Sequence, residues 1–182
     1  MASIITATTT SGLTQSADNS GVLQLASGTG NLVTVPSVTG TAMVSGNMPA
    51  FSAYQSSVQT LSSVTNTKIQ LQTEEFDTAN CFDSTTNYRF TPNVAGYYQV
   101  SAALRVNASN TLVRPMIYKN GSNYKTGSDS GSANASSMEV SCLVYLNGST
   151  DYVEFWGLVG TGQVLAATSP DTWFQGILIR AA

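Results

Sequence analysis

From Met48 onward, short runs of apolar residues alternate with clusters of Asn, Gly, Ser and Pro. The runs recur at intervals of about ten residues, which is typical of the strands of an antiparallel sandwich or jelly roll. No stretch keeps the 3.6-residue period of a long helix. The pattern therefore predicts an all-β domain, with strands over residues 50–55, 67–72, 97–106, 113–120, 136–146, 151–159 and 172–180.

The run over residues 97–106 has the clearest two-residue period, which predicts a strand with one face in a core. One face carries Tyr98, Val100, Ala102, Leu104 and Val106, and the other carries Tyr97, Gln99, Ser101, Ala103 and Arg105. Pro115 lies inside the next run. Because proline lacks the backbone N–H, we expect the strand over residues 113–120 to be an edge strand or to carry a bulge.

The N-terminal stretch differs from the rest, since residues 1–46 contain one charged residue, Asp18, and no aromatic residue. Without aromatic side chains it buries little surface by itself. Within it, "VLQLASGTGNLVTV" predicts a β-hairpin over residues 22–35. We expect residues 1–47 to form an arm that docks on another protein and residues 48–182 to form the domain. The residues expected to attach the arm are Ile4, Ile5, Leu13, Val22, Leu23 and Leu25.

Composition and charge narrow the range of partners. Charged residues make up 9% of the chain, and the formal net charge is −3. The basic residues are scattered from Lys68 onward, so no basic patch neutralises phosphates and we expect no nucleic-acid binding. No apolar run reaches the roughly 18 residues that span a bilayer, so we expect no membrane insertion. The N-terminus lacks the features of a secretory signal, so we expect no secretion by that route.

Two cysteines, Cys81 and Cys142, allow either one disulfide or two free thiols. In a secreted protein the bridge would be favoured. Cys142 alternates with apolar neighbours in "MEVSCLVYL", as a small buried hydrophobic residue does. Together with the missing secretory signal, this favours free thiols.

The sequence offers little for catalysis. It has no histidine, which removes the commonest general base and the Ser-His-Asp and Cys-His arrangements. Two cysteines cannot complete a zinc site, and no Gly-rich loop has phosphate-binding spacing. The cluster of Glu74, Glu75 and Asp77 favours a solvated turn over a glycosidase pair. Asp129 and Asp151 are candidate calcium ligands, but no loop of dense oxygen ligands surrounds them. We therefore expect no enzyme, no cofactor and no metal.

The stretch "FTPNVAGYYQV" (residues 90–100) resembles a signature of the C1q-like, tumour-necrosis-factor-like jelly roll. In that signature a Phe opens a turn, a Pro and a Gly shape it, and paired aromatic residues begin the next strand. Here these are Phe90, Pro92, Gly96, Tyr97 and Tyr98. Further stretches resemble the family in the same order: residues 49–55, 74–83, 116–124, 144–155 and 172–179.

The resemblance implies a C1q-like jelly roll over about residues 49–182 that assembles as a homotrimer. Tyr98, Phe155 and Trp173 are the residues expected at the trimer interface. Trp156 and Phe174 are expected in the core or the interface rather than on a sugar-binding platform. No Gly-X-Y stem precedes the domain, so complement recognition is not implied.

The sequences of these motifs also resemble those of C-terminal modules of tailed-bacteriophage virion proteins. This implies a non-enzymatic structural protein on the particle surface, assembled in the host cytoplasm. One hypothesis is a trimeric capsid decoration (cement) protein whose arm binds the major capsid protein or other virion proteins. The alternative is a tail fibre or tail appendage tip that binds a host surface glycan or receptor through loops 107–112, 121–137 and 159–171. A carbohydrate-processing enzyme and a secreted C1q-like protein are the remaining, less supported hypotheses.

Overall fold

The computed structural model describes residues 23–26, 32–35, 48–110, 112–129, 135–165, 167–168 and 170–182. Within these residues every regular element is a strand, which confirms the all-β prediction, and no helix is long and apolar enough to span a bilayer. The chain forms two compact units, Met1–Gly40 and Thr41–Ala182. The predicted division after residue 47 stays a prediction.

The first unit contains an antiparallel hairpin of β1 (Leu23–Ala26) and β2 (Leu32–Val35), as the sequence predicted. Its register pairs Leu23 with Val35 and Leu25 with Val33.

The strands of the second unit are β3 (Ala50–Tyr54), β4 (Thr60–Leu61), β5 (Thr67–Lys68), β6 (Thr73–Asp77), β7 (Phe82–Asp83), β8 (Arg89–Phe90), β9 (Gly96–Asn110), β10 (Val113–Lys119), β11 (Ser122–Thr126), β12 (Ala135–Leu146), β13 (Val153–Val159), β14 (Gln163–Val164) and β15 (Trp173–Ala181).

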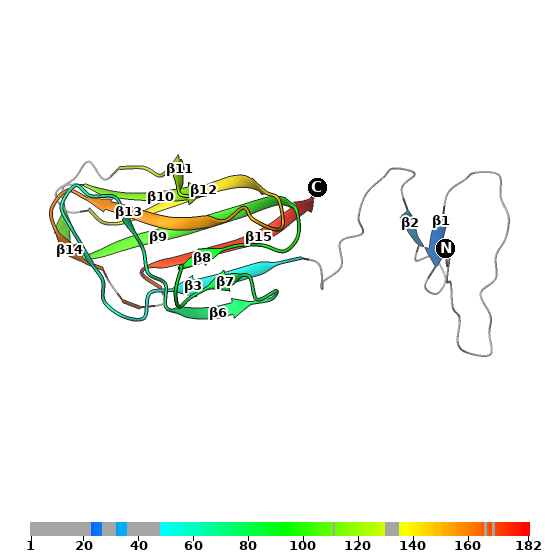
Figure 1. Cartoon of the computed structure of the whole chain (residues 1–182), viewed down its shortest axis with the longest axis horizontal. Coiled ribbons are helices and arrows are strands. Elements are labelled where there is room, and N and C mark those ends of the chain that lie inside the picture. The colour runs from blue at the N-terminus through cyan, green and yellow to red at the C-terminus, as the bar shows by residue number, and fades with distance from the viewer. Residues whose placement is uncertain are drawn as a thin grey trace. The chain divides into compact units, whose positions relative to one another are not determined.

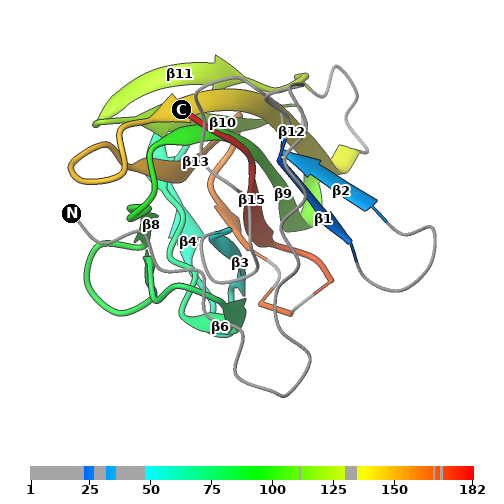
Figure 2. The ribbon, with the colours of Figure 1, turned by 90° about the vertical axis from the view of Figure 1, so that its right-hand side faces the viewer.

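Two large antiparallel sheets and a small sheet that pairs β14 with β4 form the second unit (Figure 1). The five-stranded sheet has the order β12-β9-β15-β3-β6. The six-stranded sheet has the order β11-β10-β13-β8-β7, with β5 also paired to β13. Strand β9 starts at Gly96, opposite Leu146 and Ala181, so the C-terminus and the start of β9 mark one end of the unit. We call this end the base, and Figure 2 looks toward it.

The core between the sheets is centred on stacked aromatic rings. Phe51 of β3 stacks on Phe90 and Phe82 at centroid distances of 4.3 and 5.0 Å, and it meets the edge of Phe174 at 4.9 Å. Phe51, Phe90 and Phe174 are fully buried. Rings of this size dominate core energetics, so these contacts fix how the two sheets pack.

The stretch that resembles the family signature forms the turn into β9. Tyr98 packs edge-on against Phe90, and its hydroxyl donates a hydrogen bond to the Val94 carbonyl at 2.7 Å. Gly96 is required at the strand start, because a Cβ there would lie 2.3 Å from the Arg180 carbonyl oxygen. The signature therefore has a physical basis in the buried contact between Phe90 and Tyr98 and in the close packing at Gly96.

The strand predicted over residues 67–72 is shorter than expected and spans only Thr67–Lys68. The side-chain amide of Gln59 replaces a partner strand here. Its Nε2 donates to the Lys68 carbonyl at 2.8 Å, and its Oε1 accepts from the Gln70 N–H at 2.9 Å. Ile69 and Leu71 are buried, and the Ile69 N–H donates to the Phe155 carbonyl of β13 at 2.9 Å, so β13 and Gln59 together satisfy this part of the backbone.

Strand β10, which contains Pro115, is not an edge strand, because it pairs with both β11 and β13. The predicted irregularity is present, since the β10–β11 register shifts between Ile117 and Tyr118. The Pro115 carbonyl accepts a hydrogen bond from Gly127, just beyond the last residue of β11. The missing N–H of Pro115 thus falls where the neighbouring strand has ended.

Strand β12 lies at the edge of the five-stranded sheet, and side chains from the other sheet cover part of it. The Tyr124 hydroxyl donates to the Leu143 carbonyl at 3.1 Å, and the Lys119 ammonium donates to the Tyr145 carbonyl at 2.8 Å. These bonds satisfy carbonyls that have no strand partner on that side.

The outer face of the six-stranded sheet is closed by the chain itself. Met116, Tyr118 and Leu158 are only 2–8% exposed there. The Trp156 ring stacks on Tyr118 at 4.4 Å, and its Nε1 donates to the buried carboxylate of Glu154 at 3.0 Å. Lys68 pairs with that carboxylate at 2.6 Å, so the polar groups here have partners.

Candidate functional site: an apolar sheet face

The outer face of the five-stranded sheet leaves large apolar side chains uncovered near the base. They are 41–57% exposed, and we call them the base patch: Phe76, Tyr97, Leu143, Tyr145, Ile177 and Ile179. Half-exposed side chains of this size leave on the order of 500 Å² of apolar surface, near the upper end for a monomer. The base patch is therefore a candidate interaction surface.

The register of the sheet explains why these residues gather. Tyr145 lies opposite Tyr97, with ring centroids 5.5 Å apart. One step along the strands, Gln99 of β9 lies between Leu143 and Ile177. Ile179 belongs to the exposed set because the two-residue alternation of β15 carries Gln175, Ile177 and Ile179 to the outer face.

A hollow of about 260 Å³ lies on this face between Phe76 and Ile177. Its remaining lining comes from Ala50, Phe51, Gln99, Ser101, Gln175 and Gly176. Most of its surface is apolar, so it suits an apolar side chain from a partner better than a polar ligand.

Uncharged polar groups form the next row of the same face. Gln99 donates to the Ser141 hydroxyl at 2.5 Å, and Gln175 donates to Ser101 at 3.2 Å. Because these groups bond to one another within the sheet, burying the row against a partner leaves few polar atoms without a partner.

The structure separates the three residues predicted at the trimer interface. Tyr98 and Phe155 are fully buried between the two sheets of a single chain, so they are core residues with no surface to offer another copy. Trp173 lies on the outer face of β15, opposite Ala103 and Tyr54, and is partly exposed. The alternating pattern identified two faces of each strand, but two of the three predicted interface residues, Tyr98 and Phe155, lie on the core-facing one.

The residues predicted to attach the arm are only partly visible. Leu23 and Leu25 belong to β1, opposite Val35 and Val33. Ile4, Ile5, Leu13 and Val22 lie outside the described residues. The loops 107–112, 121–137 and 159–171 also contain residues outside that range.

The candidate calcium ligands are engaged elsewhere. Arg114 binds the Asp129 carboxylate through two nitrogens and lowers its pKa. The Asp151 carboxylate accepts from Asn120 and pairs with Lys119, and both contacts lower its pKa. Across the described ranges, no cluster of acidic, cysteine or histidine side chains could hold a metal ion.

The predicted solvated turn is wrong, because Glu74, Glu75 and Asp77 lie in strand β6, which pairs with β3. Asp77 accepts hydrogen bonds from the Ala79 and Phe82 N–H groups and so closes the turn before β7. Both thiols are free, as expected. Burial raises the pKa of Cys81 and of Cys142, which keeps them protonated and weakly nucleophilic.

Comparison with known proteins shows the fold. No protein-family model and no curated protein matches the sequence. Among solved structures, the globular domain of zebrafish complement 1qA superimposes with a TM-score of 0.55 at 16% identity, covering 74% of this chain and 98% of that one. Murine APRIL gives 0.58 at 9% identity over 72% of this chain and 99% of that one.

The vertex protein P5 of PRD1 is similar as well, with a TM-score of 0.52 at 11% identity, covering 73% of this chain and 96% of that one. These matches establish a C1q-like, tumour-necrosis-factor-like jelly roll, as the sequence predicted. At such identities they show the fold alone.

Proposed function

We propose that this chain is a non-enzymatic structural protein of a bacteriophage virion, and that it assembles as a homotrimer through the base patch. The observation that carries the proposal is the large apolar surface left on the outer face of the five-stranded sheet. A second copy of the chain is the simplest partner for it. The similarity in fold to a PRD1 vertex protein supports a place on a virion.

In a threefold ring, the surface that docks and the surface that receives are different. The base patch reaches both edges of its sheet, from Leu143 and Tyr145 on β12 to Phe76 on β6. This arrangement lets the β12 edge of one copy enter the hollow beside Phe76 in the next. Trp173 is kept as a further candidate contact on the same face.

We also propose that the arm over residues 1–47 attaches the trimer to the capsid, as a cement protein does. The hairpin pairs Leu23 with Val35 and Leu25 with Val33. An isolated two-stranded hairpin is marginally stable, so it gains by docking on a partner. A trimer with three such arms would bind an assembled shell with avidity and stabilise it by mass action.

The test is the copy number in purified particles, measured against the major capsid protein by quantitative mass spectrometry. About one chain per capsid subunit is expected for a decoration protein. A ratio of a few per cent would instead place the chain on a tail appendage, and absence from the particle would overturn the virion assignment. Deleting residues 1–47 should leave the trimer intact and abolish its binding to capsids that lack the protein.

A further inference from the structure

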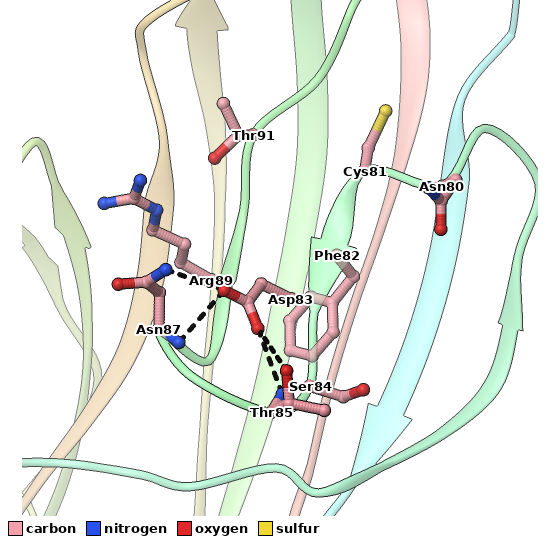
Figure 3. Close-up of a pocket in the computed structure, with 9 residues that line it drawn as sticks. All are labelled: Asn80, Cys81, Phe82, Asp83, Ser84, Thr85, Asn87, Arg89 and Thr91. Atoms are coloured by element: carbon pink, nitrogen blue, oxygen red, sulfur yellow. Dashed lines mark hydrogen bonds between the residues drawn. The ribbon is translucent and has the colours of Figure 1, made fainter.

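A polar pocket of about 480 Å³ lies beside the β7–β8 hairpin (Figure 3). None of its lining residues belongs to the base patch, and the hairpin is part of the other sheet. Its volume falls in the range of small-molecule sites, about 300–1,000 Å³. The pocket is therefore a candidate site that the assembly proposal leaves unused.

The floor of the pocket is held rigid by Asp83. Its carboxylate accepts hydrogen bonds from the N–H groups of Thr85, Thr86 and Asn87 and from the Thr85 hydroxyl and the Asn87 amide. These bonds, the Thr86 N–H first, hold the pKa of Asp83 well below its usual range. Asp83 is thus a fixed anion whose hydrogen-bonding capacity is used within the turn.

Other side chains around the pocket have hydrogen-bonding capacity to spare. Within the described residues, the side chains of Asn80, Ser84 and Thr91 form no hydrogen bond. Figure 3 shows Asn80 on one side of the pocket, Thr91 and Arg89 on the other, and Ser84 at the turn. The pocket thus offers an amide and two hydroxyls from three different segments of its rim.

Arg89 adds a cation that has no carboxylate partner among the described ion pairs. Its guanidinium stacks on the Tyr152 ring at 4.3 Å, which orients the group and leaves its N–H donors available in the plane of the stack. The residue before it, Tyr88, has a φ of 50°, which is unusual for a bulky side chain. Asn80 has a φ of 52°. Strained backbone of this kind is often found at binding sites.

We propose that this pocket binds a neutral sugar unit, such as a hexose or an N-acetylhexosamine. Sugar hydroxyls both donate and accept, which matches the mixture of amide, hydroxyl and guanidinium groups. The fixed anion Asp83 and the cation Arg89 offset each other, so the lining gives no net field that would favour phosphate. The proposal does not depend on the virion assignment or on trimer assembly.

The test is saturation-transfer NMR on the full-length protein with glucose, galactose, mannose and N-acetylglucosamine, each titrated to 50 mM. We expect at least one of them to bind with a dissociation constant on the order of 1 mM, as an open polar pocket allows. No saturation transfer from any of the four sugars at 50 mM would overturn the proposal.

Two variants locate the binding. Asn80→Gly removes the amide and suits the positive φ, and Thr91→Val removes a hydroxyl at constant shape. The double variant should bind at least tenfold more weakly with an unchanged thermal midpoint. Thr60→Val, an exposed threonine on β4, is the matched control and should bind as the wild type does. Equal binding by the double variant would show that the sugar binds elsewhere and would overturn the assignment.

Inorganic phosphate is the competing probe for the ligand class. It should neither bind the pocket, observed through the amide signals of Ser84–Arg89, nor displace the sugar at 20 mM. Displacement by phosphate would show that the pocket is an anion site and would overturn the neutral-ligand assignment.

Discussion

The two outer faces of the sandwich differ in how far their apolar side chains are exposed. On the six-stranded sheet, Met116, Tyr118 and Leu158 are almost fully covered, and Glu154, Lys68 and Trp156 complete one another's contacts. On the five-stranded sheet, the base patch stays about half exposed. Both faces belong to the same domain and were built from the same alternating pattern.

The apolar side chains on the outer face of the six-stranded sheet are covered by the same chain, whereas those of the base patch are not. A closed outer face adds to the folding stability of the single chain. The apolar surface of an open face stabilises the protein only when a partner covers it. The same kind of side chain should therefore have different effects on the two faces, and the following predictions test this.

The largest effect is expected for Ile177→Asp, which places a charge at the centre of the base patch. Burying an unpaired charge costs several kcal/mol, so association should weaken by more than a hundredfold. Light scattering after size exclusion should show a fall from the mass of three chains to that of one. Val58→Asp, at an exposed position outside the base patch, should remain trimeric. A trimeric Ile177→Asp protein would contradict the assignment of the interface.

Next comes a matched pair of aromatic truncations in the monomeric Ile177→Asp background. Trp156→Ala removes the stack on Tyr118 and a hydrogen bond to Glu154, so the free energy of unfolding should fall by about 2–3 kcal/mol. Tyr145→Ala, on the open face, should cost less than about 1 kcal/mol. Urea unfolding measures both. Equal losses of unfolding free energy in the two variants would contradict the proposed difference between the two outer faces.

A smaller effect, of opposite sign, is expected at Gln55. This side chain is fully buried at the end of the β3 region, and neither its Nε2 nor its Oε1 has a hydrogen-bond partner in the described part of the chain. Gln55→Met keeps the volume and removes the unsatisfied polar atoms, so unfolding should require about 1 kcal/mol more. A lower denaturation midpoint would show that the amide is satisfied in solution.

An effect of similar size is expected for Asp83→Asn, a loss of about 1 kcal/mol of unfolding free energy at pH 7 after allowing for solvent exposure. The pKa of Asp83 is depressed in the folded state. Its contribution is therefore complete above the unfolded carboxyl pKa of about 4 and is lost as the pH falls below it. Thermal melts should show the difference from wild type shrinking between pH 5 and pH 2. A constant difference would contradict the proposed role of the charge.

Mild acid should not dissociate the proposed trimer. The pKa values of Asp83, Asp129 and Asp151 are all lowered, and none of these residues is in the base patch. We therefore expect the trimer mass to stay constant between pH 7 and pH 5. Dissociation in that range would show that an ionisable group does contribute to the interface.

Sequence patterns predicted most strands, because a two-residue period directly reports which side chains enter a sandwich core. They were less informative where a side chain replaces a strand partner. The amide of Gln59 satisfies the backbone around Lys68, and nothing in the local pattern signals that bond across eleven residues.

The residues of the proposed trimer interface were also hard to predict from the sequence. Tyr98 and Phe155 were chosen as large aromatic residues, but the core and an interface both favour such residues. The exposed position of Ile179 follows from the two-residue alternation of β15, but the run "GILI" hides this period because residues on both faces of the strand are apolar. The polar pocket was missed altogether, because its lining comes from turns that look like ordinary Asn- and Ser-rich connections.

The covering of strand β12 has a consequence for how copies of the protein can associate. An uncovered edge of twelve residues would offer its carbonyls to the same strand of a neighbouring molecule, and such pairing can continue into fibrils. Tyr124 and Lys119 occupy the carbonyls of Leu143 and Tyr145, within the part of β12 that carries the exposed apolar residues. Removing both side chains should therefore turn a self-limiting assembly into one that precipitates during expression.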